Sequence, residues 1–106
     1  MIVRMWRGKV PRKLKSEYVA YLNQTGLPDY GTIEGNKGVY LLCQDMGENV
    51  EFLTMTFWSS IEAIRKFAGE DYEKARYYPE DEKFLLNFAE KAEHFEILYD
   101  GAKDSK

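Results

Sequence analysis

The chain's only histidine, His94, lies two residues before Glu96 in the stretch AEHFEILY, which alternates like a β-strand. Residues two apart on a strand point to the same side, so His94 and Glu96 would share a face. An imidazole oriented by a carboxylate, with an unperturbed pKa of about 6.5, is suited to take a proton from a substrate. The alternative is a histidine at a sheet edge beside a solvent-facing glutamate. One histidine and one glutamate are too few ligands for a metal site.

Arg4 and Trp6 share a face of the predicted first strand, residues 2–8. A buried arginine in a central strand must be paired or must face a pocket, because an unpaired buried charge is costly. Arg4 is suited to hold an enolate, phenolate or carboxylate oxygen while Trp6 stacks on a ring. The alternative is a structural salt bridge from Arg4 to a carboxylate such as Glu96 or Glu51.

Three tyrosines, Tyr72, Tyr77 and Tyr78, lie in an acid-rich link between a helix that ends at Gly69 and a segment that begins at Pro79. Tyrosine combines an apolar body with a polar tip, which suits a residue that closes a site and hydrogen bonds its contents. We predict that the link is a lid over a ligand-sized space between the helices and the sheet. The alternative is packing of the link onto the domain, or contact with a partner chain.

Other chemically capable side chains have structural explanations. Trp58, at the end of a strand, is a candidate substrate contact and equally a core residue. The acids at 80–82 are explained by a helix start, where the helix dipole favours carboxylates, rather than by a metal. Cys43, the single cysteine, is predicted to be an inert buried thiol and excludes an intrachain disulfide. No phosphate loop, nucleophile elbow, zinc spacing or nucleotide fingerprint is present, so we expect no cofactor.

Hydrophobic periodicity and turn residues predict the elements that position these side chains. Ser59 is predicted to cap a helix with Glu62, and Leu85 and Phe88 are predicted to face inward from a later helix. In chain order the elements are a strand at 2–8, a helix from Pro11 to Gly26, a turn-rich loop at 27–38, a hairpin of 39–46 and 50–58 around a three-residue loop, helices at 59–69 and from Pro79, and a strand at 92–99.

This β-α-β-β-α-(α)-β order predicts an α+β fold of the ferredoxin-like split βαβ type, an antiparallel sheet with its helices on one face. Both faces of the sheet carry apolar side chains. Leu53, Met55 and Phe57 alternate with Phe52 and the semi-apolar residues that follow it. Helices on one face leave the other uncovered, so we predict a homodimer that packs sheet against sheet.

Length and composition indicate one soluble domain. The 106 residues are predicted to form a single domain at 1–99 with a frayed polar tail at 100–106. The net charge of −3 argues against nucleic acid and anionic membranes as partners. Arginines interrupt the apolar start and no long apolar run follows, so we expect no signal peptide, no membrane span and a cytoplasmic location. Aromatic residues make up 15% of the chain, enough to fill a small core or to line a pocket.

The stretch FWSSIEAIRKFAGEDYEKARYYPEDE carries a Trp at a strand end, a Ser-capped helix and an F-A-G-x-D turn. With the order of elements, it resembles the antibiotic biosynthesis monooxygenase superfamily, the dimeric α+β barrel proteins, over roughly residues 1–99. The resemblance implies a cofactor-independent monooxygenase-like enzyme acting on a small aromatic or quinol substrate. His94 and Arg4 would be catalytic, and the substrate would be bound by Trp6, Tyr72, Tyr77, Tyr78 and Trp58.

Other functions remain as alternatives. A dimeric module that binds a small hydrophobic ligand without turnover, or serves a stress response, would use the same pocket. Haem degradation is disfavoured. The haem-degrading members of the superfamily use an Asn, a Trp and an axial His, and the corresponding places in this chain hold Arg4 or Trp6, Phe67 and Arg76. RNA binding is disfavoured because the chain is acidic and lacks the aromatic signature of RNA-binding sheets.

Overall fold

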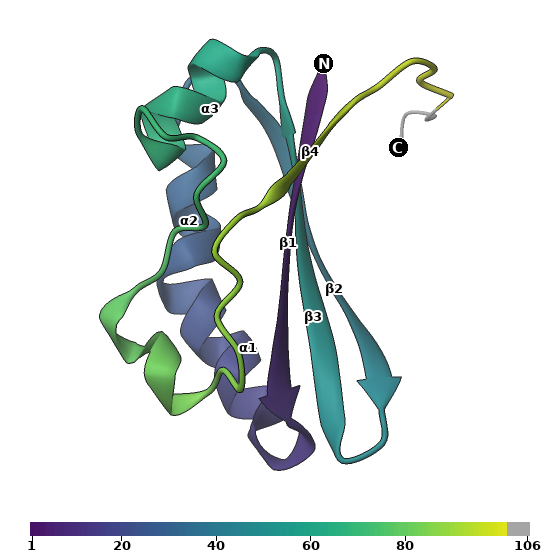
Figure 1. The fold of residues 1–106 in the computed structure, drawn as a ribbon, viewed down its shortest axis with the longest axis vertical. Helices are drawn as coiled ribbons and strands as arrows, with labels where there is room; N and C mark the ends of the chain where they lie inside the picture. The colour runs from purple at the N-terminus through teal and green to yellow at the C-terminus, as the bar shows by residue number, and fades with distance from the viewer. Residues whose placement is uncertain (102–106) are drawn as a thin grey trace.

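The computed structural model describes residues 1–101 and contains one antiparallel sheet with helices on one face (Figure 1). The prediction of an α+β, ferredoxin-like fold is confirmed. Residues 102–106, which form most of the tail predicted to be frayed, lie outside the described part. The strands are β1 (Ile2–Pro11), β2 (Asn36–Met46), β3 (Asn49–Trp58) and β4 (Glu93–Glu96), in the spatial order β2-β3-β1-β4.

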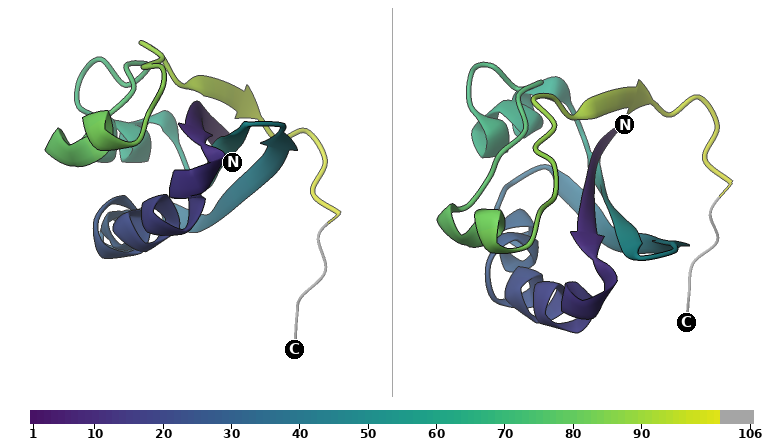
Figure 2. Two further views of the ribbon diagram at one scale, coloured as in Figure 1. Left: turned by 90° about the horizontal axis from the view of Figure 1, so that it is seen from below. Right: turned by 60° about the horizontal axis from the view of Figure 1, so that its bottom comes forward.

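All the helical segments lie on the same side of the sheet, as Figure 2 shows from two further directions. Two are 3₁₀ turns and three are α-helical; none of those in the described residues is long and apolar enough to cross a membrane. They are η1 (Arg12–Leu14), α1 (Lys15–Gln24), α2 (Gly26–Gly31), α3 (Ile61–Ala68) and η2 (Pro79–Lys83).

The long central pair β1 and β3 determines which side chains face the helices. The two strands pair along their whole length, from Ile2 opposite Trp58 to Pro11 opposite Asn49. β3 is buried at every second residue, as expected for a sheet with one covered face. Arg4 and Trp6 of β1 lie opposite Thr56 and Thr54, which are buried positions of β3. The side chains of Arg4 and Trp6 therefore face the helices.

Two clusters of buried side chains fill the space between sheet and helices. One cluster lies under α1 and η2, and the other lies under α2 and α3. Each contains aromatic rings that pack between the helices and the sheet. The buried members are Val10, Tyr18, Leu22, Val50, Phe52 and Leu85 in the first cluster, and Tyr30, Trp58, Ala63, Ile64 and Phe67 in the second.

The segment predicted to be a turn-rich loop contains the short helix α2, so that part of the prediction is wrong. Its sequence GLPDYG is poor in helix-forming residues. Tyr30 is nevertheless buried between Trp58 and Phe67, with ring centroids 6.3 and 4.7 Å away. Packing of this one ring against the sheet and α3 therefore outweighs the weak local propensity.

The helix predicted from Pro79 is only the five-residue 3₁₀ turn η2, and Phe88 does not face inward. Leu85 is buried as predicted, whereas Phe88 is 45% exposed. The helix ends because the backbone N–H of Leu86 donates to the carbonyl of Lys9, 2.8 Å away. Lys9 lies on the part of β1 whose edge is not paired with β4. A hydrogen bond to an open strand edge replaces the next helical turn.

Smaller corrections concern element ends. The N-cap of α3 is Ser60, whose side chain accepts from the N–H of Ala63, and not Ser59. The β2–β3 loop has two residues rather than three, and the last strand ends at Glu96. Cys43 is exposed, not buried, because it lies on the edge strand β2 beyond the cover of the helices.

The second face of the sheet is covered by no helix of the described chain. By register, one continuous apolar surface crosses all four strands on that side. We call it the open face; its apolar members are Val3, Met5, Tyr40, Leu42, Leu53, Met55, Phe57 and Phe95. Tyr40 is 60% exposed, which is high for a large ring in a strand.

Candidate functional site

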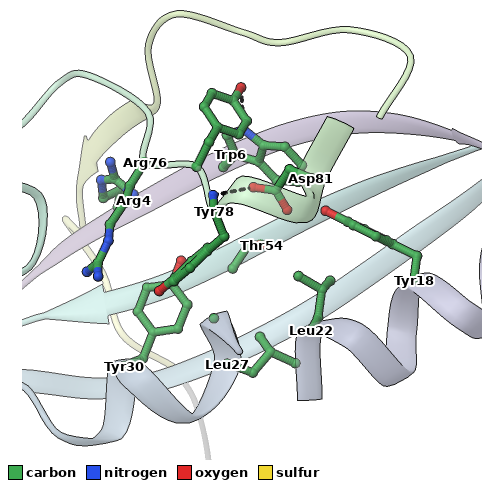
Figure 3. Close-up of a pocket in the computed structure, with 12 residues that line it drawn as sticks. Arg4, Trp6, Tyr18, Leu22, Leu27, Tyr30, Thr54, Arg76, Tyr78 and Asp81 are labelled. Carbon is green, nitrogen blue, oxygen red and sulfur yellow. Dashed lines mark hydrogen bonds between the residues drawn. The ribbon is translucent and has the colours of Figure 1, made fainter. Parts of the chain in front are cut away.

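A small cavity lies between the sheet and the segment that connects η2 to the rest of the chain. Its volume is about 40 Å³. β1 and β3 form its floor, α1 and α2 one wall, and the residues around η2 its cover (Figure 3). The lining residues are Arg4, Trp6, Tyr18, Leu22, Gly26, Leu27, Tyr30, Thr54, Arg76, Tyr77, Tyr78 and Asp81.

Arg4 is the only buried cation at this cavity, since its residue is 3% exposed. Its Nη2 donates to the carbonyl of Lys74 at 3.0 Å, and its Nε–H is buried without an acceptor. Burial lowers the pKa of its guanidinium below the ordinary value, and the neighbouring charge of Arg76 lowers it further. Within residues 1–101, Arg4 forms no ion pair.

The predicted alternative of a salt bridge from Arg4 to Glu51 or Glu96 is therefore wrong. Glu51 lies opposite Lys9, on the other face of the sheet, and approaches Arg7 at 4.0 Å. Glu96 lies opposite Ile2 at the exposed end of β4.

A second guanidinium, that of Arg76, lies at the same end of the cavity. Arg4 and Arg76 both contact the ring of Phe67, with their guanidinium carbons 5.4 and 4.8 Å from its centroid. Arg76 also donates to the carbonyl of Phe67 at 3.2 Å and lies 3.9 Å from a carboxylate oxygen of Asp29. Unlike Arg4, Arg76 is partly exposed and has a carboxylate beside it.

Trp6 and Tyr77 fix the cover to the sheet. The Nε1–H of Trp6 donates to the hydroxyl of Tyr77 at 3.1 Å, and that hydroxyl donates to the carbonyl of Ala89 at 2.6 Å. The indole ring lies over Gly8: a Cβ added there would be 2.3 Å from Cη2 of Trp6. Gly8 is thus the residue that lets the indole lie flat along β1.

Tyr78 and Asp81 close the cavity at η2. The hydroxyl of Tyr78 donates a short hydrogen bond to Asp29 of α2, and its backbone N–H donates to Asp81 at 2.6 Å. Burial raises the pKa of both the Tyr78 phenol and the Asp81 carboxyl. The acids predicted to mark a helix start do so, and Asp81 turns inward as its cap.

His94 lies directly opposite Arg4 in the β1–β4 ladder and faces the helix side. The ring of Tyr72 packs edge-on against it, with centroids 5.1 Å apart, and its Nε2 is buried without a hydrogen-bond partner. Burial lowers its pKa below 6.5, and the charge of Arg4 acts in the same direction. A neutral imidazole beside an arginine has the protonation state that a general base needs.

The residues predicted for the site thus divide into three places. Four of them, Arg4, Trp6, Tyr77 and Tyr78, line the cavity. His94 lies opposite Arg4 on β4, and Tyr72, from the link after α3, packs against its ring. Trp58 is fully buried in the core, where it donates to Thr56 at 2.8 Å, and it does not line the cavity.

Eight of the twelve lining residues were not identified from the sequence as site residues, and three of these bear on the chemistry of the cavity: Tyr30, Arg76 and Asp81. Tyr30 lay in a segment predicted to be a loop, and Arg76 was considered only as a substitute for a haem ligand. Asp81 could be suspected from its place three residues after Tyr78, the spacing of a reciprocal cap. No sequence signal points to Tyr30.

The space under the cover is much smaller than a ligand-sized pocket, so that prediction does not describe this conformation. Ligand pockets usually measure about 300–1,000 Å³. At about 40 Å³ the cavity holds a few water molecules or one small polar group. Trp6, Arg76 and Tyr78 are among the side chains that line and limit this space.

The residues present do not fit haem. The cavity lining includes no histidine, cysteine or methionine, and its volume is far below that of a tetrapyrrole. Arg76, at the place where the resemblance implies the axial histidine of haem-degrading proteins, lies against Phe67. Among residues 1–101, the structure brings together no three His, Cys, Asp or Glu side chains that could hold a metal ion.

Comparison with solved structures identifies the class of fold: the chain has the fold of the antibiotic biosynthesis monooxygenase proteins. A protein from Bacillus cereus named as a candidate antibiotic biosynthesis monooxygenase matches over 96% of this chain and 97% of its own, with 16% identity and a TM-score of 0.68.

The haem degrader MhuD of Mycobacterium tuberculosis, solved with two haems in its active site, matches over 96% of this chain and all of its own. Its identity is 20% and its TM-score 0.66. A mutant of MhuD with two manganese protoporphyrins per active site gives 20% identity and a TM-score of 0.65. No family model and no curated protein matches the sequence. Identities this low establish the fold and leave the activity open.

Proposed function

We propose that the protein is a cofactor-independent monooxygenase-like enzyme acting on a small aromatic or quinol substrate beside Arg4. The observation that carries this proposal is the juxtaposition of Arg4 and His94. They are directly opposite on β1 and β4, on the covered face of the sheet, and each has a buried nitrogen without a partner. Directly opposed residues in an antiparallel pair have Cβ atoms about 4.5–5.5 Å apart.

The two side chains have complementary roles in the proposed reaction. Neutral His94 takes the phenolic proton of the substrate, and Arg4 holds the resulting anion. The carbanion form of the substrate adds to dioxygen, and the hydroperoxide that results loses water to leave a carbonyl. The substrate supplies all the electrons and dioxygen is the only oxidant, so the chain's own residues need only move a proton and stabilise an oxyanion.

The substrate needs more room than the cavity offers, so the cover must move during binding. The cover is well suited to do so, because outside η2 its backbone forms no helix or long strand. Trp6, Tyr77 and Tyr78 then contact the substrate ring, and Tyr72 positions His94.

The test is an oxygen-uptake assay with a panel of quinols, comparing wild type with His94→Gln and Arg4→Met. Both variants should lose at least about tenfold in rate if each group acts in the proton transfer or on the anion. Arg12→Met is the control, since Arg12 follows β1 directly, does not line the cavity and pairs with Asp45 of β2. Unchanged turnover in both site variants would refute the mechanism.

The rival function is a module that binds a small hydrophobic ligand without turnover. It predicts saturable binding of an aromatic compound and no oxygen uptake with any substrate of the panel. The closed cavity is compatible with this function as well, because binding alone also requires movement of the cover.

We further propose that the functional unit is a homodimer in which two open faces pack together. Most of the face is apolar, with Leu42, Met55 and Phe57 among its members, and its charged pair, Arg7 with Glu93, is internally compensated. No helix of the described chain covers it. Association of two copies would bury this surface from water.

A further inference from the structure

We infer that the cavity binds the carboxylate of a small monocarboxylate ligand, with Arg4 as its main partner. The inference deepens the proposed function and depends on it only in placing the ligand at this cavity. It states that the aromatic substrate is an aromatic acid.

The first argument is charge. Arg4 is a nearly fully buried cation that forms no ion pair within residues 1–101, and its single hydrogen bond is to a backbone carbonyl. Removing a charge from water costs several kcal/mol unless an opposite charge compensates it. Its buried Nε–H is moreover left without an acceptor. A ligand that brings one negative charge and an oxygen acceptor would remove both penalties.

The second argument is the distribution of the neighbouring charges. Asp29 is already engaged by the hydroxyl of Tyr78 and lies near Arg76. Asp81 lines the cavity but accepts from the backbone of Tyr78 and forms no ion pair within the described chain. Asp81 is not among the groups whose charge acts on Arg4, whereas Arg76 is, and the charge of Arg76 is offset by Asp29. The charge that remains beside Arg4 is therefore one positive charge, which matches a monoanion better than a phosphate dianion.

The third argument is shape. A guanidinium presents its N–H groups in a plane that matches the two oxygens of a carboxylate. The cavity of about 40 Å³ accommodates such a head group but not an aromatic ring. The hydroxyl of Tyr30 lies near both arginines, and burial raises its pKa, so it stays protonated and able to donate. The head group would bind in the existing space while the ring displaces the cover.

The test titrates the wild-type protein with acetate and with acetamide, which has the same shape without the charge, at constant ionic strength. The readout is the NMR resonance of the Arg4 Nε–H together with the dissociation constant. Acetate should shift this resonance and acetamide should not. Benzoate against benzamide repeats the comparison with a ring attached, and inorganic phosphate tests the preference for a monoanion.

Arg4→Met should weaken benzoate at least about tenfold, the usual value of a hydrogen bond to a charged group. Arg12→Met, whose substituted residue does not line the cavity, should bind as wild type does. If Arg4→Met does not fold, the Arg4 resonance in the wild type decides alone. An unmoved resonance, equal binding of benzamide, or tighter binding of phosphate than of benzoate would overturn the inference.

The outcome is separable from that of the proposed function because binding is measured without turnover. Benzoate binding at Arg4 without oxygen uptake on any aromatic acid would retain the carboxylate site and refute the oxygenase. Oxygen uptake on neutral quinols that is insensitive to carboxylates would retain the oxygenase and refute the carboxylate site.

Discussion

At the scale of single residues, the site combines a buried cation with a half-buried imidazole whose Nε2 has no hydrogen-bond partner. Neither arrangement favours stability, because Arg4 is desolvated without a counter-charge and His94 leaves a ring nitrogen unpaired. Unfavourable groups of this kind concentrate at functional sites. The residues that stabilise the fold, such as Trp58 and Phe52, lie elsewhere and are fully buried.

His94 should titrate below pH 6.5, because burial and then the charge of Arg4 lower its pKa. The folded state then binds fewer protons than the unfolded state just below pH 6.5, so stability falls as the pH decreases through that range. His94→Gln should remove this part of the pH dependence. NMR titration of the His94 ring and urea unfolding at pH 5 to 7.5 measure both effects.

Arg4→Met provides the control for that titration. With the positive charge removed, the His94 pKa should rise towards 6.5, while the part caused by burial remains. A midpoint at or above 6.5 in the wild type would contradict the placement of His94 beside Arg4.

Gly8→Ala should disturb the site through a single methyl group. The new Cβ would meet Trp6 at 2.3 Å, so the indole must rotate and its hydrogen bond to Tyr77 must break. We expect a loss of about 1–3 kcal/mol in the free energy of unfolding and a change in Trp6 fluorescence. Gly31→Ala is the matched control, since nothing lies within 4 Å of its added Cβ; equal behaviour of the two variants would contradict the packing described.

Residue types alone pointed to Arg4, Trp6, Tyr77 and Tyr78, which line the cavity. A buried arginine needs a partner or a pocket, and amphipathic rings suit the wall of a pocket. Residue types did not identify Tyr30 or the inward turn of Asp81, since both depend on contacts between distant segments. The exposure of Cys43 was not predicted for a related reason. The alternation of residues along a strand predicts which face of the sheet a side chain lies on, but not how far the helices extend over that face.

At the scale of elements, the cover is a loop whose two ends pair with each other in a short ladder, which we call the neck. Ala75 donates to the carbonyl of Glu90 at 2.9 Å, Ala92 donates to that of Glu73 at 2.8 Å, and Lys74 and Lys91 form an isolated bridge between them. Residues 76–89, which we call the cover loop, thus leave and rejoin the domain at nearly one point. The carbonyl of Lys74 in this neck is the acceptor of Arg4.

Tyr78→Phe should loosen the cover loop, because it deletes the hydrogen bond to Asp29. A partly exposed bond to a charged group should contribute about 1 kcal/mol, so amides of the loop should exchange with deuterium roughly fivefold faster. Tyr40→Phe is the control, since Tyr40 lies exposed on the open face. Unchanged exchange in the loop of Tyr78→Phe would show that this bond does not hold the cover closed.

Local sequence signals predicted α3 and the hairpin strands β2 and β3 to within a few residues at their ends. In these segments the capping, alternation and turn signals agree with one another. They failed for α2 and for the segment after Pro79. In both, a contact far along the chain decides the conformation: Tyr30 with Phe67 in one case and Leu86 with Lys9 in the other. Tertiary contacts override weak local preferences in both places.

At the scale of the whole molecule, the domain is covered on one side of its sheet only (Figure 2). The site occupies the covered side and the apolar open face occupies the other. The fold class was predictable from the order of the elements, because few arrangements bury a sheet of this pattern. The size of the cavity was not predictable, since it depends on how the side chains of the cover loop pack.

The open face should make the protein dimeric at micromolar concentration, as measured by light scattering after size-exclusion chromatography. Met55→Lys places a charge among Met5, Tyr40 and their neighbours on this face and should give a folded monomer. Gln44→Lys, at the polar end of the same face, should remain dimeric. A monomeric wild type would contradict the proposed assembly.

The closed neck of the cover loop has a consequence for how such a protein can diversify. Because residues 76–89 begin and end at one short ladder, the loop can be exchanged for another of different length without moving β1, β3 or β4. The arginine, the imidazole and the lining residues from the sheet, α1 and α2 would stay in place, while the lining residues that the cover loop contributes are replaced. In the proposed function, part of the selectivity for the ligand would therefore be carried by a segment separable from the proposed chemistry, and grafting a foreign loop onto the Lys74–Lys91 bridge is the direct way to alter one while retaining the other.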